Sequence, residues 1–364
     1  MKKCLTLLPV LLIWAALTLF AWFGPVKEIS EAERRPLEQM PAVTADALLS
    51  GRYMKDFEDA SLDQFPLRDT FRKVKSLFHF GVFRQSDNNG IYIADGFATV
   101  QEYPLKKESV DHAVSRFQSV YDRYLADTGS KVYMAVVPDK GYYLGAQSGH
   151  LTMDYGAMMQ TVREGMPWAT HIDLTGVLSG DDYYRTDTHW RQENLLEAAG
   201  VLCEAMGAKK PSPEDYTQAA LQRPFYGVYY GQAALPMEAD TMYLLESEGL
   251  KNCTVFDYET GKTGAVYDMT KLDSRDLYDV FLSGSKSLLR IDNPDAETDR
   301  ELIVFRDSFG SAMVPLLVQG YKTVTLVDIR YLQSSMLGRY LEFTGQDVLF
   351  LYSTLVLNNS GSIK

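Results

Sequence analysis

The sequence predicts an α/β fold in which a mostly parallel sheet is flanked by helices. Short runs such as 131–137 are almost continuously apolar, as expected of strands that are buried on both faces. Segments with apolar residues at helical spacing, such as 108–126, separate these runs. Polar residues follow directly after several of the strands, where α/β sheets collect their functional groups. Together these three observations favour the α/β class.

The predicted elements alternate along the chain. They are half of a hairpin at 91–96, a helix at 108–126, strands at 131–137 and 171–174, a helix at 190–206, a strand at 302–305, a helix at 311–319, and strands at 323–327 and 348–352. An earlier helical segment reaches about residue 80, before an Asn-Asn-Gly turn. The stretch 210–300 is polar and rich in turns, and we interpret it as an irregular insertion rather than a separate domain.

The N-terminus predicts that the body of the protein lies outside the cytoplasmic membrane. Lys2 and Lys3 precede an apolar, charge-free run at 5–23, which as a helix would span roughly 28 Å. We therefore expect a signal anchor with one transmembrane helix at 1–25, a charged, proline-containing stalk at 26–50, and an ectodomain at 51–364. The alternative is a cleaved signal that releases the protein.

Composition excludes several classes of function. The net charge of -12, without a basic patch, argues against binding to nucleic acid. The three cysteines form no zinc motif, so we expect no metal and no cofactor. Whether Cys203 and Cys253 form a disulfide stays open, because the sequence does not give the distance between the two side chains.

Two stretches contain the parts of a nucleophilic site. The first, 184–190, places Asp187 and His189 two residues apart, and the second, 302–310, runs from a buried strand into Ser308 and a glycine. A histidine can take the proton of a serine hydroxyl as it attacks, and an aspartate can orient that histidine. Ser308 is also expected at the start of a helix, where its backbone N–H would favour a developing oxyanion.

Each of these residues also has a structural interpretation. Ser308 can belong to an ordinary turn after a strand, and Asp187 can cap a helix while His189 lies on the surface. Asp187, His189 and Asp307 can also be read as metal ligands, although no further histidine at ligand spacing supports a metal.

The order and spacing of several motifs resemble a known family. The sequences 187–190 (Asp-Thr-His-Trp) and 307–310 (Asp-Ser-Phe-Gly) resemble the SGNH-hydrolase-like domain of the periplasmic alginate O-acetyltransferases (AlgX/AlgJ type). They resemble still more the related DHHW proteins of Gram-positive bacteria. Blocks at 63–69, 89–96 and 137–140 extend the resemblance over about 55–355. Thr188 departs from the Asp-His-His-Trp of the family name, and the serine follows the histidine, the reverse of the order in ordinary SGNH enzymes.

The resemblance implies a fold, an activity and partners. The fold would be SGNH-hydrolase-like, with Ser308 as nucleophile, His189 as general base and Asp187 as the acid that orients it. The activity would be O-acetyl transfer to an extracellular polysaccharide or wall glycan, with a membrane-bound O-acyltransferase as the acetyl supplier. Two alternatives stay open: a carbohydrate O-acetylesterase of the same fold, and a non-catalytic glycan-binding or assembly protein.

Further candidates for substrate binding lie at predicted strand ends. They are Lys140, Arg306, Arg330 and Tyr331. The three cationic side chains could neutralise an acidic glycan or an oxyanion, or each could pair with a neighbouring aspartate. The aromatic stretch 225–231 could stack on sugars or form a packed hairpin.

Overall fold

The computed structural model describes residues 2–30 and 32–364, apart from the side chains of residues 2–6. The chain divides into two compact units. The first comprises Met1–Asn89 with Tyr230–Met237, and the second comprises Gly90–Tyr229 with Glu238–Lys364. We describe each unit by itself.

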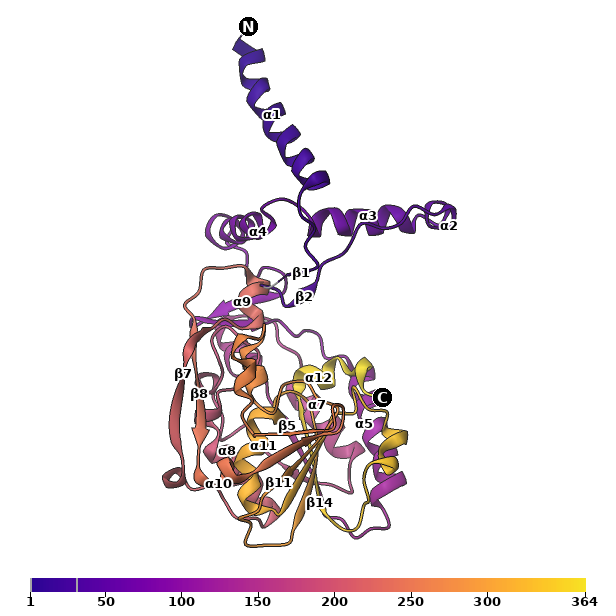
Figure 1. Cartoon of the computed structure of the whole chain (residues 1–364), viewed down its shortest axis with the longest axis vertical. Helices are drawn as coiled ribbons and strands as arrows, with labels where there is room; N and C mark the ends of the chain where they lie inside the picture. Colours follow the sequence, from indigo (N-terminus) through magenta and orange to yellow (C-terminus); the bar gives the residue numbers. More distant parts are fainter. Residues whose placement is uncertain (1, 31) are drawn as a thin grey trace. The chain divides into compact units, whose positions relative to one another are not determined.

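The first unit is mainly helical. Its elements are α1 (Lys2–Phe23), β1 (Ile29–Ser30), β2 (Arg35–Pro36), α2 (Ala45–Leu49), α3 (Arg52–Asp63) and α4 (Arg68–Leu77), and α9 (Val228–Ala233) contains one of the divisions between the units (Figure 1). The strands β1 and β2 pair antiparallel. The predicted stalk at 26–50 therefore contains this short ladder and α2.

The helix α1 covers the apolar run from which a transmembrane segment was predicted. Among the described residues, no helix is long and apolar enough to cross a membrane. The structure therefore gives no support to the predicted transmembrane helix.

The second unit is built on an eight-stranded sheet with the order β10-β9-β11-β13-β12-β14-β5-β6 (Figure 1). Its strands are β5 (Val132–Val137), β6 (Thr170–Ile172), β9 (Thr254–Asp257), β10 (Lys262–Gly264), β11 (Leu288–Asp292), β12 (Glu301–Arg306), β13 (Thr323–Val327) and β14 (Asp347–Ser353). The neighbours β13, β12, β14, β5 and β6 run parallel, whereas β10, β9, β11 and β13 pair antiparallel.

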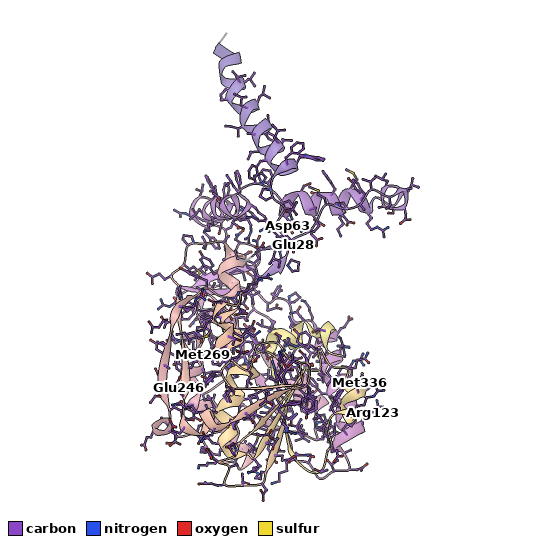
Figure 2. The ribbon with its side chains drawn as sticks, in the orientation of Figure 1. Glu28, Asp63, Arg123, Glu246, Met269 and Met336 are labelled. Carbon is purple, nitrogen blue, oxygen red and sulfur yellow. The ribbon has the colours of Figure 1, made fainter. Side chains whose placement is uncertain are left out.

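The sheet is therefore mixed: its five neighbouring parallel strands agree with the predicted parallel sheet, whereas the stretch 210–300, interpreted as an irregular insertion, adds antiparallel pairings to it. Three strands of the stretch 210–300, β9, β10 and β11, extend the sheet beyond β13 through antiparallel pairings. These strands were not predicted, because antiparallel strands contain more polar residues than central parallel strands do. The same stretch forms a long hairpin of β7 (Thr217–Phe225) and β8 (Asp240–Glu246), drawn side by side in Figure 1. Glu246, labelled in Figure 2, is the last residue of β8.

Helices cover both faces of the sheet, as predicted. Along β12, Leu302 and Val304 pack into one hydrophobic core, while Ile303 and Phe305 pack into the other. This alternation is the two-residue period of a strand. The helices α8 (Leu196–Met206) and α11 (Gly310–Leu317) contribute to the first core, and α5 (Lys107–Val120) and α7 (Tyr155–Gly165) contribute to the second.

Among the remaining elements, β3 (Ile91–Ala94) and β4 (Phe97–Val100) form the hairpin of which the sequence predicted one half. The short helices α6 (Lys140–Leu144), α10 (Glu248–Asn252) and α12 (Thr354–Asn358) were not predicted. The helix predicted at 190–206 begins only at Leu196, because the preceding residues form a loop and a short 3-10 turn. Cys203 and Cys253 are both buried and free, so they form no disulfide.

Candidate active site

The second unit brings Asp187, His189 and Ser308 into one chain of hydrogen bonds. His189 Nδ1 lies 2.6 Å from Asp187 Oδ1, and His189 Nε2 lies 2.8 Å from Ser308 Oγ. His189 therefore has the carboxylate on one ring nitrogen and the serine hydroxyl on the other. This arrangement allows the ring to accept the hydroxyl proton at Nε2 while Nδ1–H donates to the carboxylate.

The Asp187 carboxylate is fully buried, and protein donors surround it. Oδ1 also accepts from the backbone N–H of His189 at 3.0 Å, and Oδ2 accepts from the N–H of Val228 at 2.8 Å. A buried carboxylate needs such donors, because an unpaired one is costly in free energy. The bonds to His189 fix the orientation of the imidazole relative to the loop.

Two aromatic rings flank the His189 imidazole. Tyr278 stacks on it, with ring centroids 3.9 Å apart and an angle of 8° between the planes. Phe309, next to the serine, packs at 5.1 Å with a tilt of 55°. Tyr278 lies in a 3-10 turn at Leu277–Val280, about 90 residues from the histidine in sequence, and no local motif signals its role. The contacts of Tyr278 and Phe309 with the His189 imidazole restrict rotation of the imidazole away from Ser308.

Hydrogen bonds also tie the histidine loop to the serine segment. Trp190 Nε1 donates to the carbonyl of Phe309 at 3.1 Å, and Gln192 Nε2 donates to the carbonyl of Ala312 at 3.0 Å. Both donors lie within three residues after His189, and both acceptors lie within four residues after Ser308. The tryptophan of the Asp-Thr-His-Trp motif therefore holds together two motifs that lie far apart in the sequence.

Ser308 is partly exposed, so a substrate can reach its hydroxyl. It lies between β12 and α11, at the carboxyl end of the strand as predicted. Within the described residues, no hydrogen bond occupies its backbone N–H. This N–H, two residues before α11, is available to an oxyanion that forms next to Ser308.

A second aspartate, Asp240, holds the segment that precedes Asp187 and His189. Asp240, at the start of β8, accepts from the backbone N–H groups of Arg185 and Thr186, each at 2.9 Å. The Thr186 hydroxyl accepts in turn from the N–H of Gly227 at 2.9 Å. The hairpin β7–β8 and its connection therefore hold the segment that leads into Asp187. These contacts leave no local signal in the sequence, and the interpretations of 225–231 as a stretch that stacks on sugars or forms a packed hairpin did not include them.

The Asp307 carboxylate is bonded to groups of the protein itself, so its role is structural. Oδ1 accepts from the N–H of Phe309 at 3.0 Å, and Oδ2 accepts from the backbone N–H and the hydroxyl of Ser353 at 2.8 and 2.6 Å. These bonds join the end of β12 to the end of β14.

Within residues 2–30 and 32–364, no three histidine, cysteine or carboxylate side chains form a metal-binding group.

Lys140 lies in the interior, with 1% of its surface exposed. Its ammonium donates to the backbone carbonyls of Ala98 and Tyr184, at 2.5 and 2.8 Å. Burial lowers the pKa of Lys140 to about 7, while the nearby carboxylates of Asp187 and Asp240 act in the opposite direction. The geometry supports a lysine that positions the segment before Asp187, and substrate binding by Lys140 stays a prediction.

The other predicted binding residues differ in exposure. Arg306 is fully buried, and its Nη1 lies 3.3 Å from the Ser311 hydroxyl. Arg330 forms two hydrogen bonds with Asp328, at 2.9 and 2.7 Å, as the alternative interpretation expected. Tyr331 is 53% exposed, and the Arg330 guanidinium lies 5.5 Å from its ring centroid. Of the four, Tyr331 is the one with a largely free surface, and their roles toward substrate stay predictions.

Thr188, which stands where the family name implies a histidine, faces a tyrosine. The hydroxyl of Tyr229 donates to Thr188 Oγ1 at 3.0 Å. Thr188 is partly exposed beside the buried pair of Asp187 and His189. The substitution leaves the hydrogen bonds of that pair intact.

The fold and the site define an α/β domain with a mixed sheet, in which an aspartate, a histidine and a serine form one chain of hydrogen bonds. Residues 178–327 match the family described as DHHW protein, and the match contains Asp187, His189 and Ser308. The resemblance predicted from the sequence is therefore confirmed. A comparison with curated protein sequences finds no match.

Solved structures with this fold include a DHHW family protein from Eubacterium siraeum. It is 19% identical, with a TM-score of 0.59 over 76% of this chain and 95% of that one. PatB1 of Bacillus cereus, solved with a sulfonyl adduct, is 16% identical, with a TM-score of 0.58 over 73% and 95%. The O-acetyltransferase domain of Pseudomonas putida AlgJ matches with 15% identity and a TM-score of 0.45 over 74% and 92%. At these identities the first two matches establish the fold, and the third is too distant to add to them.

Replacing Gly227 by alanine should impair the site by displacing Asp187. A Cβ at position 227 would overlap the Cα and Cβ atoms of Asp187. We expect Gly227→Ala to lower the rate at which Ser308 reacts with a serine-directed sulfonyl fluoride by at least about tenfold, with about 1–3 kcal/mol less stability from overpacking. Gly200→Ala in α8, where nothing lies near the added Cβ, is the matched control and should leave the rate unchanged. Equal rates for the two variants would contradict the bracing of Asp187.

Lys140 should give the protein a specific dependence of stability on pH. Its pKa is about 7 in the folded protein, below the ordinary value of 10.5, so the unfolded chain binds more protons between these values. The free energy of unfolding should therefore rise as the pH increases from 7 toward 10, by up to ~1.4 kcal/mol per pH unit.

The comparison that isolates this effect uses Lys140→Met. Urea unfolding at several pH values should show the rise in the wild type and its loss in Lys140→Met, whereas Lys107→Met, at an exposed lysine, keeps it. A constant difference between the wild type and Lys140→Met over this range would refute a low pKa for Lys140.

Proposed function

We propose that this protein is an O-acetyltransferase that carries an acetyl group on Ser308 and places it on a hydroxyl of a cell-surface glycan or exopolysaccharide. The observation that carries the proposal is the hydrogen-bond chain from Asp187 through His189 to the partly exposed Ser308. These residues supply what a covalent acyl transfer requires: a nucleophile, a base, and an anion that orients the base.

In the first half of the reaction, Ser308 takes the acetyl group from a donor ester. Ser308 Oγ bonds to the acetyl carbonyl carbon as its proton passes to His189 Nε2. Negative charge develops on the carbonyl oxygen, next to the N–H of Ser308 and the start of α11. The bond from the carbonyl carbon to the donor oxygen then breaks, and the leaving oxygen takes the proton from His189. The product is acetyl-Ser308, and Asp187 remains ionised throughout.

In the second half, a sugar hydroxyl accepts the acetyl group. His189 Nε2, again neutral, takes the proton of that hydroxyl as its oxygen attacks the carbonyl carbon of acetyl-Ser308. The bond to Ser308 Oγ breaks, and the proton returns to Ser308. Water in place of the sugar gives hydrolysis, so the acceptor decides between a transferase and an esterase. This sequence requires neither a metal nor a cofactor.

The choice of substrate rests on family resemblance. The motifs shared with the alginate O-acetyltransferases imply an acetyl group and a polysaccharide acceptor, and the match to the DHHW family supports this class of fold. The partner that we propose is a membrane-bound O-acyltransferase that supplies the acetyl group.

The proposed location is outside the cytoplasmic membrane. Lys2 and Lys3 ahead of an apolar run support export of the rest of the chain, either attached through residues 5–23 or released after cleavage. A protein with this location can meet a cell-surface glycan directly.

The proposal predicts one covalent adduct on Ser308. PatB1 has been solved with a sulfonyl adduct, and the same type of reagent suits this chain. We expect intact-protein mass spectrometry after treatment with a sulfonyl fluoride to show one modification, which peptide mapping assigns to Ser308. Ser308→Ala should abolish it, Asp187→Asn should slow it by several orders of magnitude, and the exposed Ser335→Ala should leave it unchanged.

Acceptor sugars then separate the alternatives. Transfer of acetyl from an activated ester to an oligosaccharide, faster than release as acetate, supports the transferase. Hydrolysis that added sugars do not affect indicates an esterase. A failure to label Ser308, under conditions that label a known serine esterase, would overturn the proposal and favour a non-catalytic glycan-binding protein.

A further inference from the structure

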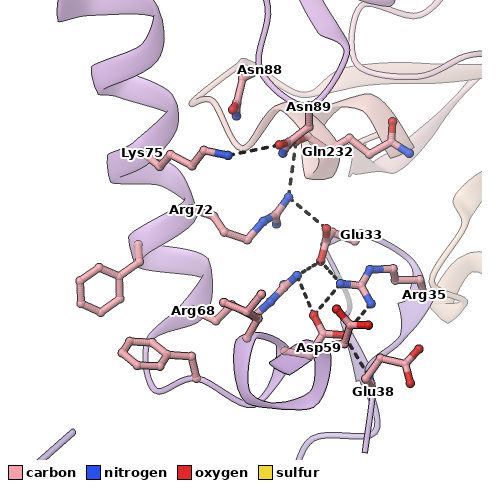
Figure 3. Close-up of a pocket in the computed structure, with 14 residues that line it drawn as sticks. Glu33, Arg35, Glu38, Asp59, Arg68, Arg72, Lys75, Asn88, Asn89 and Gln232 are labelled. Carbon is pink, nitrogen blue, oxygen red and sulfur yellow. Dashed lines mark hydrogen bonds and ion pairs between the residues drawn. The ribbon is translucent and has the colours of Figure 1, made fainter. Parts of the chain in front are cut away.

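The first unit contains a cavity that the proposed chemistry does not use. Its volume is about 770 Å³, and it is lined by α3, α4, the segment around β2, and residues 88–89 and 232 (Figure 3). This volume lies within the range of small-molecule sites and can hold one or two sugar rings. All the lining residues belong to the first unit.

The charges in the cavity cancel. Four basic side chains and four acidic ones line it: Arg35, Arg68, Arg72 and Lys75, with Glu33, Glu38, Asp59 and Asp63. Glu33 is within 2.5 Å of Arg68 and 3.2 Å of Arg72, and Asp63 binds Arg35 through two hydrogen bonds of 2.6 and 2.7 Å. Figure 3 shows this network as one continuous cluster. Paired charges favour a ligand that is polar but carries no net charge, because an ionic ligand would compete with the existing pairs.

An amide group beside this network has unused hydrogen-bonding capacity. Asn88 is 2% exposed, and its Nδ2 donates to the carbonyl of Ala233 at 3.0 Å. Its Oδ1, in contrast, has no hydrogen-bond partner within the described part of the chain. A buried carbonyl oxygen without a donor costs about 1–3 kcal/mol, which a hydroxyl donated by a ligand would recover. Asn89 and Gln232 place two further amides near it (Figure 3).

Aromatic rings form another part of the wall. Phe65 and Phe71 line the cavity with their ring centroids 5.6 Å apart, and they are 39% and 48% exposed. Exposed rings next to amides present an apolar face and hydrogen-bonding groups together. The C–H face of a sugar can pack on the rings while its hydroxyls bind the amides and the paired charges.

We propose that this cavity in the first unit binds an uncharged oligosaccharide stretch of the glycan, at a site separate from Ser308. The inference deepens the proposed function, on which it rests for the class of polymer. Its role is to hold a long acceptor chain on the protein, so that neighbouring sugar units can reach Ser308 at high effective concentration.

The test measures binding of oligosaccharides to the full chain in detergent by isothermal titration calorimetry. Chitotetraose and cellotetraose are the neutral probes, and an oligogalacturonate is the anionic comparator. All measurements use Ser308→Ala, so that no acetyl chemistry contributes. We expect a neutral probe to bind, and Phe71→Ala and Asn88→Leu, which removes the unpaired acceptor oxygen, to weaken its binding by about tenfold each. The control Phe78→Ala removes a ring that is equally exposed, at 50%, but lies outside the cavity lining, and should have no effect.

The possible outcomes separate this inference from the proposed function. Binding that Phe71→Ala weakens and Phe78→Ala does not supports the site, even if Ser308 proves unreactive. Binding that neither cavity variant changes, tighter binding of the anionic probe, or no binding of either neutral probe at 10 mM, well above the range of useful affinity, would overturn it. None of these results affects a serine adduct on the wild-type chain.

Discussion

The arrangement of the second unit depends on one fully buried carboxylate, that of Asp187. An anion removed from water must be satisfied by donors of the protein, and here the donors are two groups of His189 and the N–H of Val228. The donor that matters for chemistry is His189 Nδ1, because its bond leaves Nε2 directed at Ser308. The same bonds that satisfy the buried charge therefore set the geometry of His189 relative to Ser308.

This geometry requires the two motifs to be held together by contacts beyond the hydrogen bonds of Asp187, His189 and Ser308. The hydrogen bonds from Trp190 and Gln192 to the serine segment fix the distance between the loops, and Tyr278 limits rotation of the imidazole. Asp240 anchors the chain just before Asp187. Together they preorganise the site, which lowers the cost of reaching a reactive arrangement. They come from β8, the 3-10 turn between β10 and β11, and the segment at the start of α11, so the hairpin and this turn serve the site as well as the fold.

The central strands and the three catalytic candidates could be predicted from the sequence, because each leaves a local signal. The strand β13 was located to the residue, since a short apolar run between helices has few other interpretations. Asp187, His189 and Ser308 lie in motifs whose order along the chain resembles that of a known family. In contrast, β9, β10 and β11 were missed, because they are short, contain polar residues and lie in a turn-rich stretch. Gly227, Asp240 and Tyr278 were missed too, because their function arises from contacts between distant segments. Lys140 was predicted as a candidate for substrate binding, but its burial could not be predicted, because it depends on how distant segments pack together.

The most direct test of the account is to trap the acetyl group on the protein. An activated acetyl ester would be mixed with the full chain, the reaction quenched in acid within the first turnover, and the acetylated peptide identified by mass spectrometry. The account predicts that the acetyl group lies on Ser308, and that replacing His189 by alanine prevents its accumulation. An acetyl group on another residue, or equal acetylation without His189, would contradict the conclusion that these residues form a nucleophilic site.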